Sequence, residues 1–447
     1  MLRLRWESLS PSWSEFVIAL FRDLEPLGHS LCEDKGTFTA EVREASTITD
    51  ENHWDRTHRV SHERVLEQHR EEILSFERDF DGLFVDMATF QPSAVRPVLE
   101  VVDFKRLEHK RTVDYLRLMQ SVTVRKLVGR RMGLLIWDVG QTGGTRLFGG
   151  AVLASARFSQ RIRDQRFQWP SYYPKTSLKH DPMARAVRIA GLNRIMQLSM
   201  ACAVPPYNVL SGAWLAAIAP FTSSGLDAFK NSHKENPVDA DLAAIVTTTG
   251  KGASGSPFRG HRVAQIVPAG SKAAPDAKGD LYTQVRPKID LKPLRASFEI
   301  LLSEEARELA CRLFREEQPE RYASLNSPDR SALAFALRRL GLRRWLFDGN
   351  EIGVHLGILN GSVRDDWSTV DNLRTGLPRP PKERPLIDWE TAVAVWSRKF
   401  LPAPELVGES ADGLSKAAHR EARQSRNERA RTFPAEQIRL SHRLRQL

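Results

Sequence analysis

Cysteine is scarce in this sequence, and its scarcity excludes two kinds of protein. Cys32, Cys202 and Cys311 are the three cysteines among 447 residues, and no two of them form a C-x-x-C pair. A domain held by several disulfides and a cysteine zinc site are therefore both unexpected. Such sparse cysteine fits a reducing compartment, so we expect a cytoplasmic protein.

A segment that predicts membrane insertion is also missing. Charged residues begin the chain without an apolar stretch behind them, so no secretory signal is expected. The longest uncharged stretch spans residues 195–226, but Pro205 and Pro206 interrupt it. We expect two buried helices with a turn between them here, and no contact with a membrane.

The remaining composition predicts a folded protein of several domains. Glycine and proline number 27 and 25, too few for a low-complexity chain, and hydrophobic residues make up 41%. Apolar runs at 133–137 and 147–153 flank a Gly143-Gly144 turn, which predicts an antiparallel hairpin. Gly149 and Gly150 in its second strand indicate a bulge or a close backbone approach, and Ser303 is expected to cap a helix that runs through Glu317. We expect an α+β fold, in which helices flank a central mixed β-sheet and a helical C-terminal region follows. The expected parts are an acidic N-terminal region (1–110), a central domain (111–297), a helical domain (298–405) and a basic tail (406–447).

Charge is distributed unevenly along the chain. Residues 1–100 hold 11 Lys or Arg and 20 Asp or Glu, whereas residues 101–200 hold 19 and 6. A concentrated basic excess indicates a surface that faces a polyanion. The alternative is that the basic residues only form part of the solvated protein surface. The acidic N-terminal region could shield the polyanion-facing surface or contact a partner.

Residues 156–170 have a composition that would suit the binding of a polyanion. Four arginines alternate there with Phe158, Phe167 and Trp169. Arginine grips phosphates while aromatic rings stack on bases, so this mixture suits nucleic acid, with DNA favoured. The alternative is that the rings lie in the core and the arginines pair with acids. The predicted nucleic-acid-binding residues are Arg130, Arg131, Arg157, Arg161, Arg163, Arg166, Trp169 and Lys251.

Two residue patterns could indicate a metal site, but each is weaker evidence than the basic segment described above. Asp79 and Asp81 precede Asp103-Phe104-Lys105, and a metal-dependent nuclease of the D…D-x-K kind uses such acids to hold Mg²⁺. The pattern is short and common in charged chains, so a nuclease is a second alternative. His58, His62 and His69 lack a matching acid or cysteine, which favours packing roles. We expect neither a metal nor a cofactor.

From about residue 115 to 262 the sequence resembles the DruA family, named for the Druantia anti-phage defence system. The blocks that carry the resemblance are YLRL (115–118), GRRMGLL (129–135), the 148–157 strand with Arg163-Asp164, GLNRIMQL (191–198), AVPPYNVLSG (203–212) and IVTTT (245–249). The segment 255–260 departs from the family pattern. The resemblance implies a role in defence against phage beside other proteins of the system, a helicase among them. It implies no catalytic residue.

An acetyltransferase-like enzyme that modifies nucleic acid or protein is the first alternative. Some sequences similar to this one suggest that fold, with a hairpin, a helix, a strand and a further helix. Acyl-CoA binding there uses a Q/R-x-x-G-x-G/A turn that opens a helix. Residues 188–193 match its first half, but they lie inside the helix expected from Arg185 to Met200.

Overall fold

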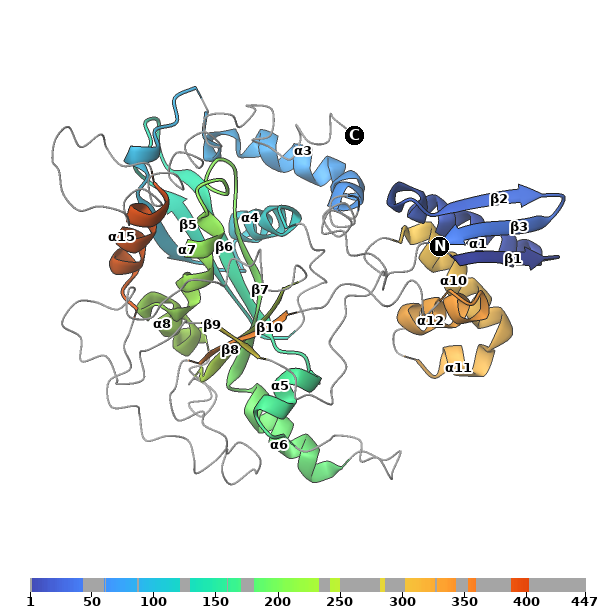
Figure 1. The fold of residues 1–447 in the computed structure, drawn as a ribbon. Helices are drawn as coiled ribbons and strands as arrows, with labels where there is room; N and C mark the ends of the chain where they lie inside the picture. Colours follow the sequence, from blue (N-terminus) through green and yellow to red (C-terminus); the bar gives the residue numbers. More distant parts are fainter. Residues whose placement is uncertain are drawn as a thin grey trace, which may run out of the picture.

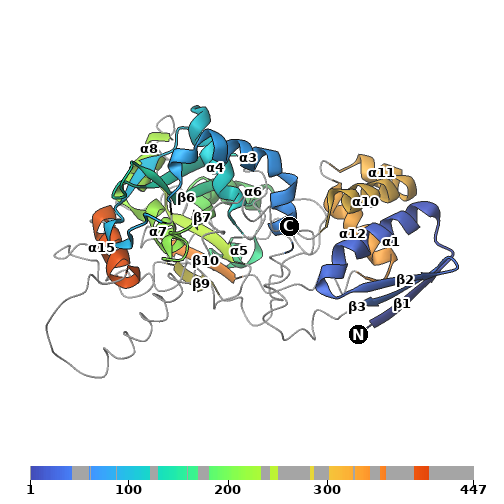
Figure 2. The same cartoon turned by 90° about the horizontal axis from the view of Figure 1, so that it is seen from above.

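The computed structural model describes two hydrophobic cores, which Figures 1 and 2 show as a larger and a smaller unit. A third, smaller cluster lies at one end of the larger unit. The described residues are 2–42, 60, 62–86, 88–120, 129–158, 160–169, 181–232, 242–249, 282–285, 302–325, 328–342, 353–358 and 387–401.

The larger unit is built on a seven-stranded mixed sheet in the order β4-β5-β6-β7-β8-β10-β9. β7 and β8 pair in parallel, and the other described neighbours are antiparallel. This architecture confirms the expected α+β class. The strands are β4 (Pro97–Val101), β5 (Arg131–Asp138), β6 (Arg146–Ser155), β7 (Ile195–Ala203), β8 (Ala244–Thr249), β9 (Tyr282–Val285) and β10 (Gly353–Ile358).

The predicted hairpin is confirmed as β5 and β6, and its glycines have a steric role. A Cβ on Gly149 would lie 2.3 Å from the carbonyl oxygen of Cys202 in β7, and one on Gly150 would lie 2.6 Å from that of Leu134 in β5. Neither neighbour is a flexible side chain. Glycine at these positions therefore permits the close approach of three central strands.

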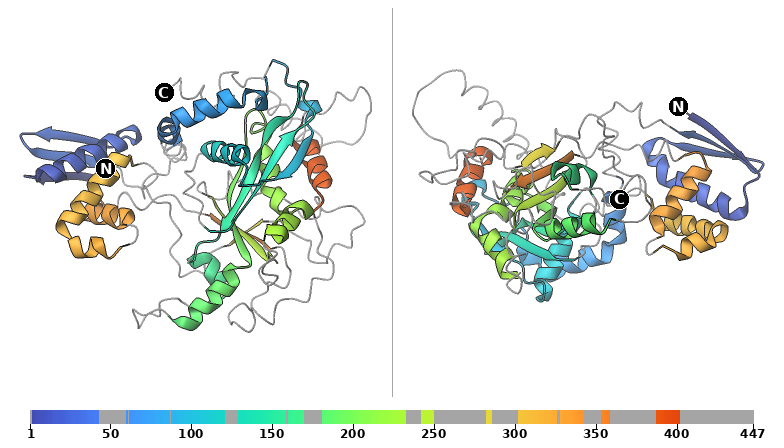
Figure 3. Two further views of the ribbon diagram at one scale, coloured as in Figure 1. Left: turned by 180° about the vertical axis from the view of Figure 1, so that it is seen from behind. Right: turned by 90° about the horizontal axis from the view of Figure 1, so that it is seen from below.

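Helices cover both faces of the sheet (Figures 1 and 3). One face carries α3 and α4, and the other carries α7, α8 and α15. Tryptophans fix α15, because Trp396 Nε1 donates to the carbonyl oxygen of Leu210 and Trp389 Nε1 to that of Pro97. The helices are α3 (Arg70–Asp79), α4 (Leu107–Leu118), α5 (Arg161–Arg166), α6 (Pro182–Leu192), α7 (Gly212–Ile218), α8 (Ser223–Ser232) and α15 (Trp389–Phe400).

The smaller unit joins two segments that lie far apart in sequence. Its sheet, in the order β1-β3-β2, packs with α1, and α1 packs against α10 and α12 in one core. Ser303 caps α10 as expected, since its hydroxyl accepts from Ala306 N–H. The elements are β1 (Leu2–Glu7), α1 (Pro11–Leu24), β2 (Ser30–Asp34), β3 (Thr37–Val42), α10 (Glu304–Glu317), α11 (Pro319–Ala323) and α12 (Asp329–Arg339).

These cores correct the predicted domain boundaries. The expected region 1–110 is divided, because residues 16–42 belong to the smaller core whereas Leu66 to Val102 belong to the larger one. The expected helical domain 298–405 is divided as well, since α10 and α12 lie in the smaller unit and α15 in the larger. Apolar faces from distant segments bury one another in each core, and such pairing leaves no local signal in the sequence. The basic tail, 406–447, lies outside the described residues.

A buried carboxylate joins the two units. Asp23 at the end of α1 accepts from the N–H and hydroxyl of Ser303, at 2.7 and 2.9 Å, and pairs with Arg64 at 3.1 Å. Two residues before Arg64, His62 Nε2 lies 2.5 Å from the carbonyl oxygen of Leu118 in the larger unit. The segment around residues 62–64 therefore contacts both cores.

The uncharged stretch holds a strand where a helix was expected. The helix expected from Arg185 to Met200 ends at Leu192, and residues from Ile195 to Ala203 form β7 in the middle of the sheet. Strands buried on both faces contain few charges, which makes them resemble buried helices in composition. No helix in the described part of the chain has the length and apolarity to cross a bilayer.

Candidate nucleic-acid interface

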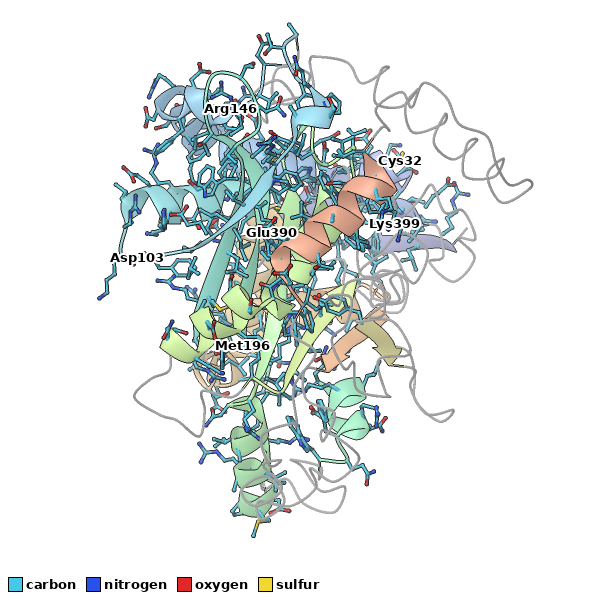
Figure 4. The ribbon with its side chains drawn as sticks, turned by 90° about the vertical axis from the view of Figure 1, so that its left-hand side faces the viewer. Cys32, Asp103, Arg146, Met196, Glu390 and Lys399 are labelled. Carbon is cyan, nitrogen blue, oxygen red and sulfur yellow. The ribbon has the colours of Figure 1, made fainter. Side chains whose placement is uncertain are left out.

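The topology gathers basic residues at one end of the larger sheet. β5 begins and β6 ends there, because the two strands are antiparallel and Arg131 pairs with Ala154. Met196 at the start of β7 pairs with Ser155 at this same end, whereas Arg146 lies at the other end of the hairpin (Figure 4). Segments that are distant in sequence thus begin or end at the same end of the sheet.

Three of the predicted arginines are exposed at this end. Arg131, Arg157 and Arg166 all face solvent. The guanidinium of Arg131 lies over the ring of Phe104, 4.6 Å from its centroid, which fixes its position without removing its charge.

Arg130 is half-buried and has a structural role. Its guanidinium donates to the carbonyl oxygens of Leu192 and Asn193 at 2.9 and 2.7 Å, where α6 ends. A cation at a helix C-terminus satisfies carbonyl groups that have no partner within the helix.

Arg163 and Trp169 are buried, which corrects the exposed positions predicted for them. Arg163 is 0% exposed and Trp169 is 6% exposed. Trp169 stacks on Phe167 with ring centroids 5.4 Å apart, and Arg163 lies 5.1 Å from the Trp169 centroid. The alternative reading of these two residues, with rings in the core and arginine paired with an acid, is therefore the correct one.

Asp164 is the acid that pairs with Arg163, and it also pairs with a second buried arginine, Arg188. Arg163 Nε donates to its Oδ1 at 2.9 Å, and Arg188 of α6 donates to its Oδ2. The backbone N–H of Gln160 donates to Oδ2 as well. Burial lowers the pKa of Arg163, and the charge of Asp164 opposes that shift. This buried cluster ties α5 to α6.

Several basic residues at this end were not singled out from the sequence. Lys105 and Arg106 follow β4, Lys110 lies in the first turn of α4, and Arg185 lies on α6. They are dispersed in the sequence, so only the strand pairing shows that their segments adjoin the same end of the sheet. We define the basic end of the sheet as the exposed cations Lys105, Arg106, Lys110, Arg131, Arg157, Arg166 and Arg185.

Three carboxylates that lie close in sequence to these cations each accept a hydrogen bond or form an ion pair. Asp103 Oδ1 accepts from Lys105 N–H, and Asp181 Oδ1 accepts from Met183 N–H, both at 2.9 Å. Glu108 pairs with Arg106 at 3.0 Å. Counted against these three carboxylates, the seven cations of the basic end leave it with a net positive charge. Of the remaining predicted residues, the side chain of Arg161 and all of Lys251 lie outside the described residues.

The nuclease pattern does not form a metal site. Asp79 Oδ2 accepts from Arg111 at 2.7 Å, and this bond holds the pKa of the Asp79 carboxyl below its usual range. Asp103 instead accepts from a backbone N–H. No group of three or more His, Cys, Asp or Glu side chains in the described ranges is placed to hold a metal ion.

The acyl-CoA turn is likewise not formed. The hairpin β5–β6, helix α6, strand β7 and helix α7 follow the element order expected for an acetyltransferase-like fold. However, residues 188–193 end α6 instead of opening a helix. Arg188 is buried against Asp164, and a Cβ on Gly191 would lie 2.2 Å from Trp169. Residues 188–193 therefore leave no room to bind the diphosphate group of an acyl-CoA, and they give no support to an acyl-transfer reaction.

The block VPPYNVLSG has a packing role at the other end of the sheet. The hydroxyl of Tyr207 donates to Oδ2 of Asp138 at 2.8 Å, and both residues are fully buried. Asp138 also accepts from Gln141 Nε2 and from the backbone N–H groups of Arg96 and Gly140. This network joins the loop after β7 to the end of β5.

We expect the stability of the protein to fall in alkali partly through Tyr207. Burial and the nearby Asp138 raise the pKa of Tyr207 far above its ordinary value. The unfolded chain releases this proton from about pH 10, whereas the folded protein retains it. This residue should therefore lower the free energy of unfolding by up to ~1.4 kcal/mol per pH unit above that pH.

Denaturant titrations of Tyr207→Phe from pH 7 to 11 test this expectation. The variant should lose about 1–2 kcal/mol at pH 7 with the hydrogen bond, and its stability should fall less steeply in alkali. Burial also raises the pKa of Cys202 to about 12, and that contribution remains in both proteins. Identical alkaline slopes would contradict the assignment.

Comparison with known proteins supports the resemblance seen in the sequence. Residues 49–256 match the family model described as Druantia protein DruA. No curated protein and no solved structure matches the chain. Residues 49–256, which carry strands β4 to β8 and the basic end of the sheet, are thus similar to the DruA family, and this match supports the link to the Druantia anti-phage defence system.

Proposed function

We propose that this defence component binds nucleic acid, DNA in preference, through the basic end of the sheet. The observation that supports the proposal is that exposed cations of α4, β5, α5, α6 and the segments after β4 and β6 belong to elements that begin or end at one end of the sheet. Because DNA carries a dense row of phosphates, such a surface attracts it without reading its sequence. The buried cluster around Asp164 holds part of that surface rigid.

We further propose that the chain acts beside other proteins of the defence system, a helicase among them. The match of residues 49–256 to the family model described as Druantia protein DruA supports this role. The smaller unit has a core of its own, and we propose that its surface contacts such a partner.

The salt dependence of DNA affinity tests the proposal. Fluorescence anisotropy with the full chain and a 20-base-pair duplex should give a log Kd that rises linearly with log salt concentration. The triple variant Arg131→Gln, Arg157→Gln, Arg166→Gln should reduce the magnitude of that slope by about 1 for each phosphate contact removed.

A matched control removes the same charge from the smaller unit. The triple variant Arg5→Gln, Arg338→Gln, Arg339→Gln takes three exposed arginines away from that unit. It should leave the slope close to that of the parent chain. If both triple variants change the slope equally, the basic end is not the binding surface.

A further inference from the structure

One face of α6 is exposed although it carries apolar side chains. Met183 is 63% exposed and Ile189 is 42% exposed, and the exposed Ala186 lies between them at three-residue spacing. Arg185 is exposed on the same helix. The opposite face, with Val187 and Gly191 among its residues, is buried.

The helix also projects from the sheet. Its C-terminal end adjoins β7, so its N-terminal end points away from the body of the larger unit, as Figures 1 and 3 show. The exposed face of this projecting helix, with Arg185 beside Met183 and Ile189, suits an occupant that accepts both apolar and cationic side chains.

We infer that α6 enters the major groove of duplex DNA, an inference that rests on the proposed function. A helix of 11 residues is about 16 Å long, and the groove is about 12 Å wide. Apolar side chains contact thymine methyl groups there, and arginine reaches guanine. The neighbouring Arg157 and Arg166 supply the charge that the phosphates on either side of a groove require.

The contacts at the base of α6 hold it in a fixed direction. Arg188 reaches Asp164 between α5 and α6, and Arg130 binds the carbonyl oxygens at the C-terminal end of α6. Trp169 packs against Gly191, where a Cβ would not fit. A helix that reads a groove needs such support, because its orientation determines which bases it meets.

Single-stranded DNA fits this surface less well. Non-specific binding of single strands relies on exposed rings that stack on bases. Phe167 and Trp169, whose sequence context suggested that role, are buried and stack on each other. Phe158 is 38% exposed and Phe104 is half-buried beneath Arg131. The surface therefore offers cations and a helix in place of a row of rings.

Comparison of three ligands with the full chain tests the inference. The ligands are a 20-base-pair DNA duplex, one of its strands, and an RNA duplex of the same sequence, measured by anisotropy at one salt concentration. The RNA duplex has a narrow major groove that side chains cannot enter. The DNA duplex should bind tightest, by at least about fivefold over each of the others.

A double variant tests the helix itself. Met183→Ala with Ile189→Ala keeps every cation and good helix formers, so it should weaken binding of the DNA duplex about fivefold to tenfold and leave the salt slope unchanged. Its effect on the RNA duplex should be small. Ile18→Ala is the control, because Ile18 is 40% exposed on α1 of the smaller unit.

The outcomes separate the inference from the proposed function. Equal affinity for all three ligands, or an unchanged duplex affinity of the double variant, would overturn the inference and leave DNA binding by the basic end in place. Loss of a protein partner by the double variant, with DNA affinity unchanged, would assign this face to that partner and would also overturn the inference. Failure of the parent chain to bind any of the three would contradict the proposed function itself.

Discussion

Asp164→Ala is expected to lower the free energy of unfolding by about 3–5 kcal/mol. The substitution leaves the guanidinium groups of Arg163 and Arg188 buried without the carboxylate that they share. An uncompensated buried charge is among the costliest defects a folded protein can carry. Thermal and urea unfolding, followed by circular dichroism, measure the loss.

Two further variants test whether the loss of stability comes from the uncompensated buried charge. Glu108→Gln removes an exposed ion pair with Arg106 and should cost less than about 1 kcal/mol. Replacing the whole cluster, with Arg163→Met, Asp164→Leu and Arg188→Met, should restore part of the stability, because no buried charge remains. An Asp164→Ala protein as stable as its parent would show that the cluster does not support the fold.

The same substitution separates positioning from charge in DNA binding. Removal of a carboxylate makes the basic end more positive, so electrostatics alone predicts tighter binding of DNA. If the cluster positions α6, Asp164→Ala should bind the duplex more weakly despite its added positive charge. Tighter binding by a folded Asp164→Ala protein would contradict a positioning role.

Gly149→Ala is expected to destabilise the protein by about 1–3 kcal/mol or more. The added Cβ would lie 2.3 Å from the carbonyl oxygen of Cys202 and 2.7 Å from the Cα of Ala203. Both atoms belong to the backbone of β7, which is fixed between two other strands, so neither can move without loss of pairing. The midpoint of urea unfolding measures the effect.

Gly82→Ala is the matched control for this substitution. An added Cβ there meets no atom within 4 Å. The variant should therefore match the parent or gain up to about 1 kcal/mol from a more restricted unfolded chain. Equal midpoints for the Gly149 and Gly82 variants would contradict the close approach of the central strands.

Local patterns in the sequence predicted the elements whose signals are local. The Gly143-Gly144 turn between two apolar runs became the β5–β6 hairpin, and Ser303 became the cap of α10. Gly149 and Gly150 mark the predicted close backbone approach. Each of these depends on a few neighbouring residues, which is why the sequence alone could indicate it.

Burial was harder to predict at the candidate site. Arg163 and Trp169 lie in a segment that also holds the exposed Arg157 and Arg166. Nothing in the spacing of this segment shows that Arg188, from a later helix, shares Asp164 with Arg163. The exposed cations Lys105 and Arg185 were missed for the same reason, because only the sheet topology brings them to one end. Contacts between distant segments determine both results.

Hydrogen–deuterium exchange with and without duplex DNA tests the central claim most directly. The full chain should show slower exchange on DNA binding in residues 103–110, 160–169 and 182–193, which carry the basic end and α6. Residues 2–42 and 302–325 of the smaller unit should exchange at unchanged rates. Slower exchange confined to the smaller unit, with none at the basic end, would contradict the account.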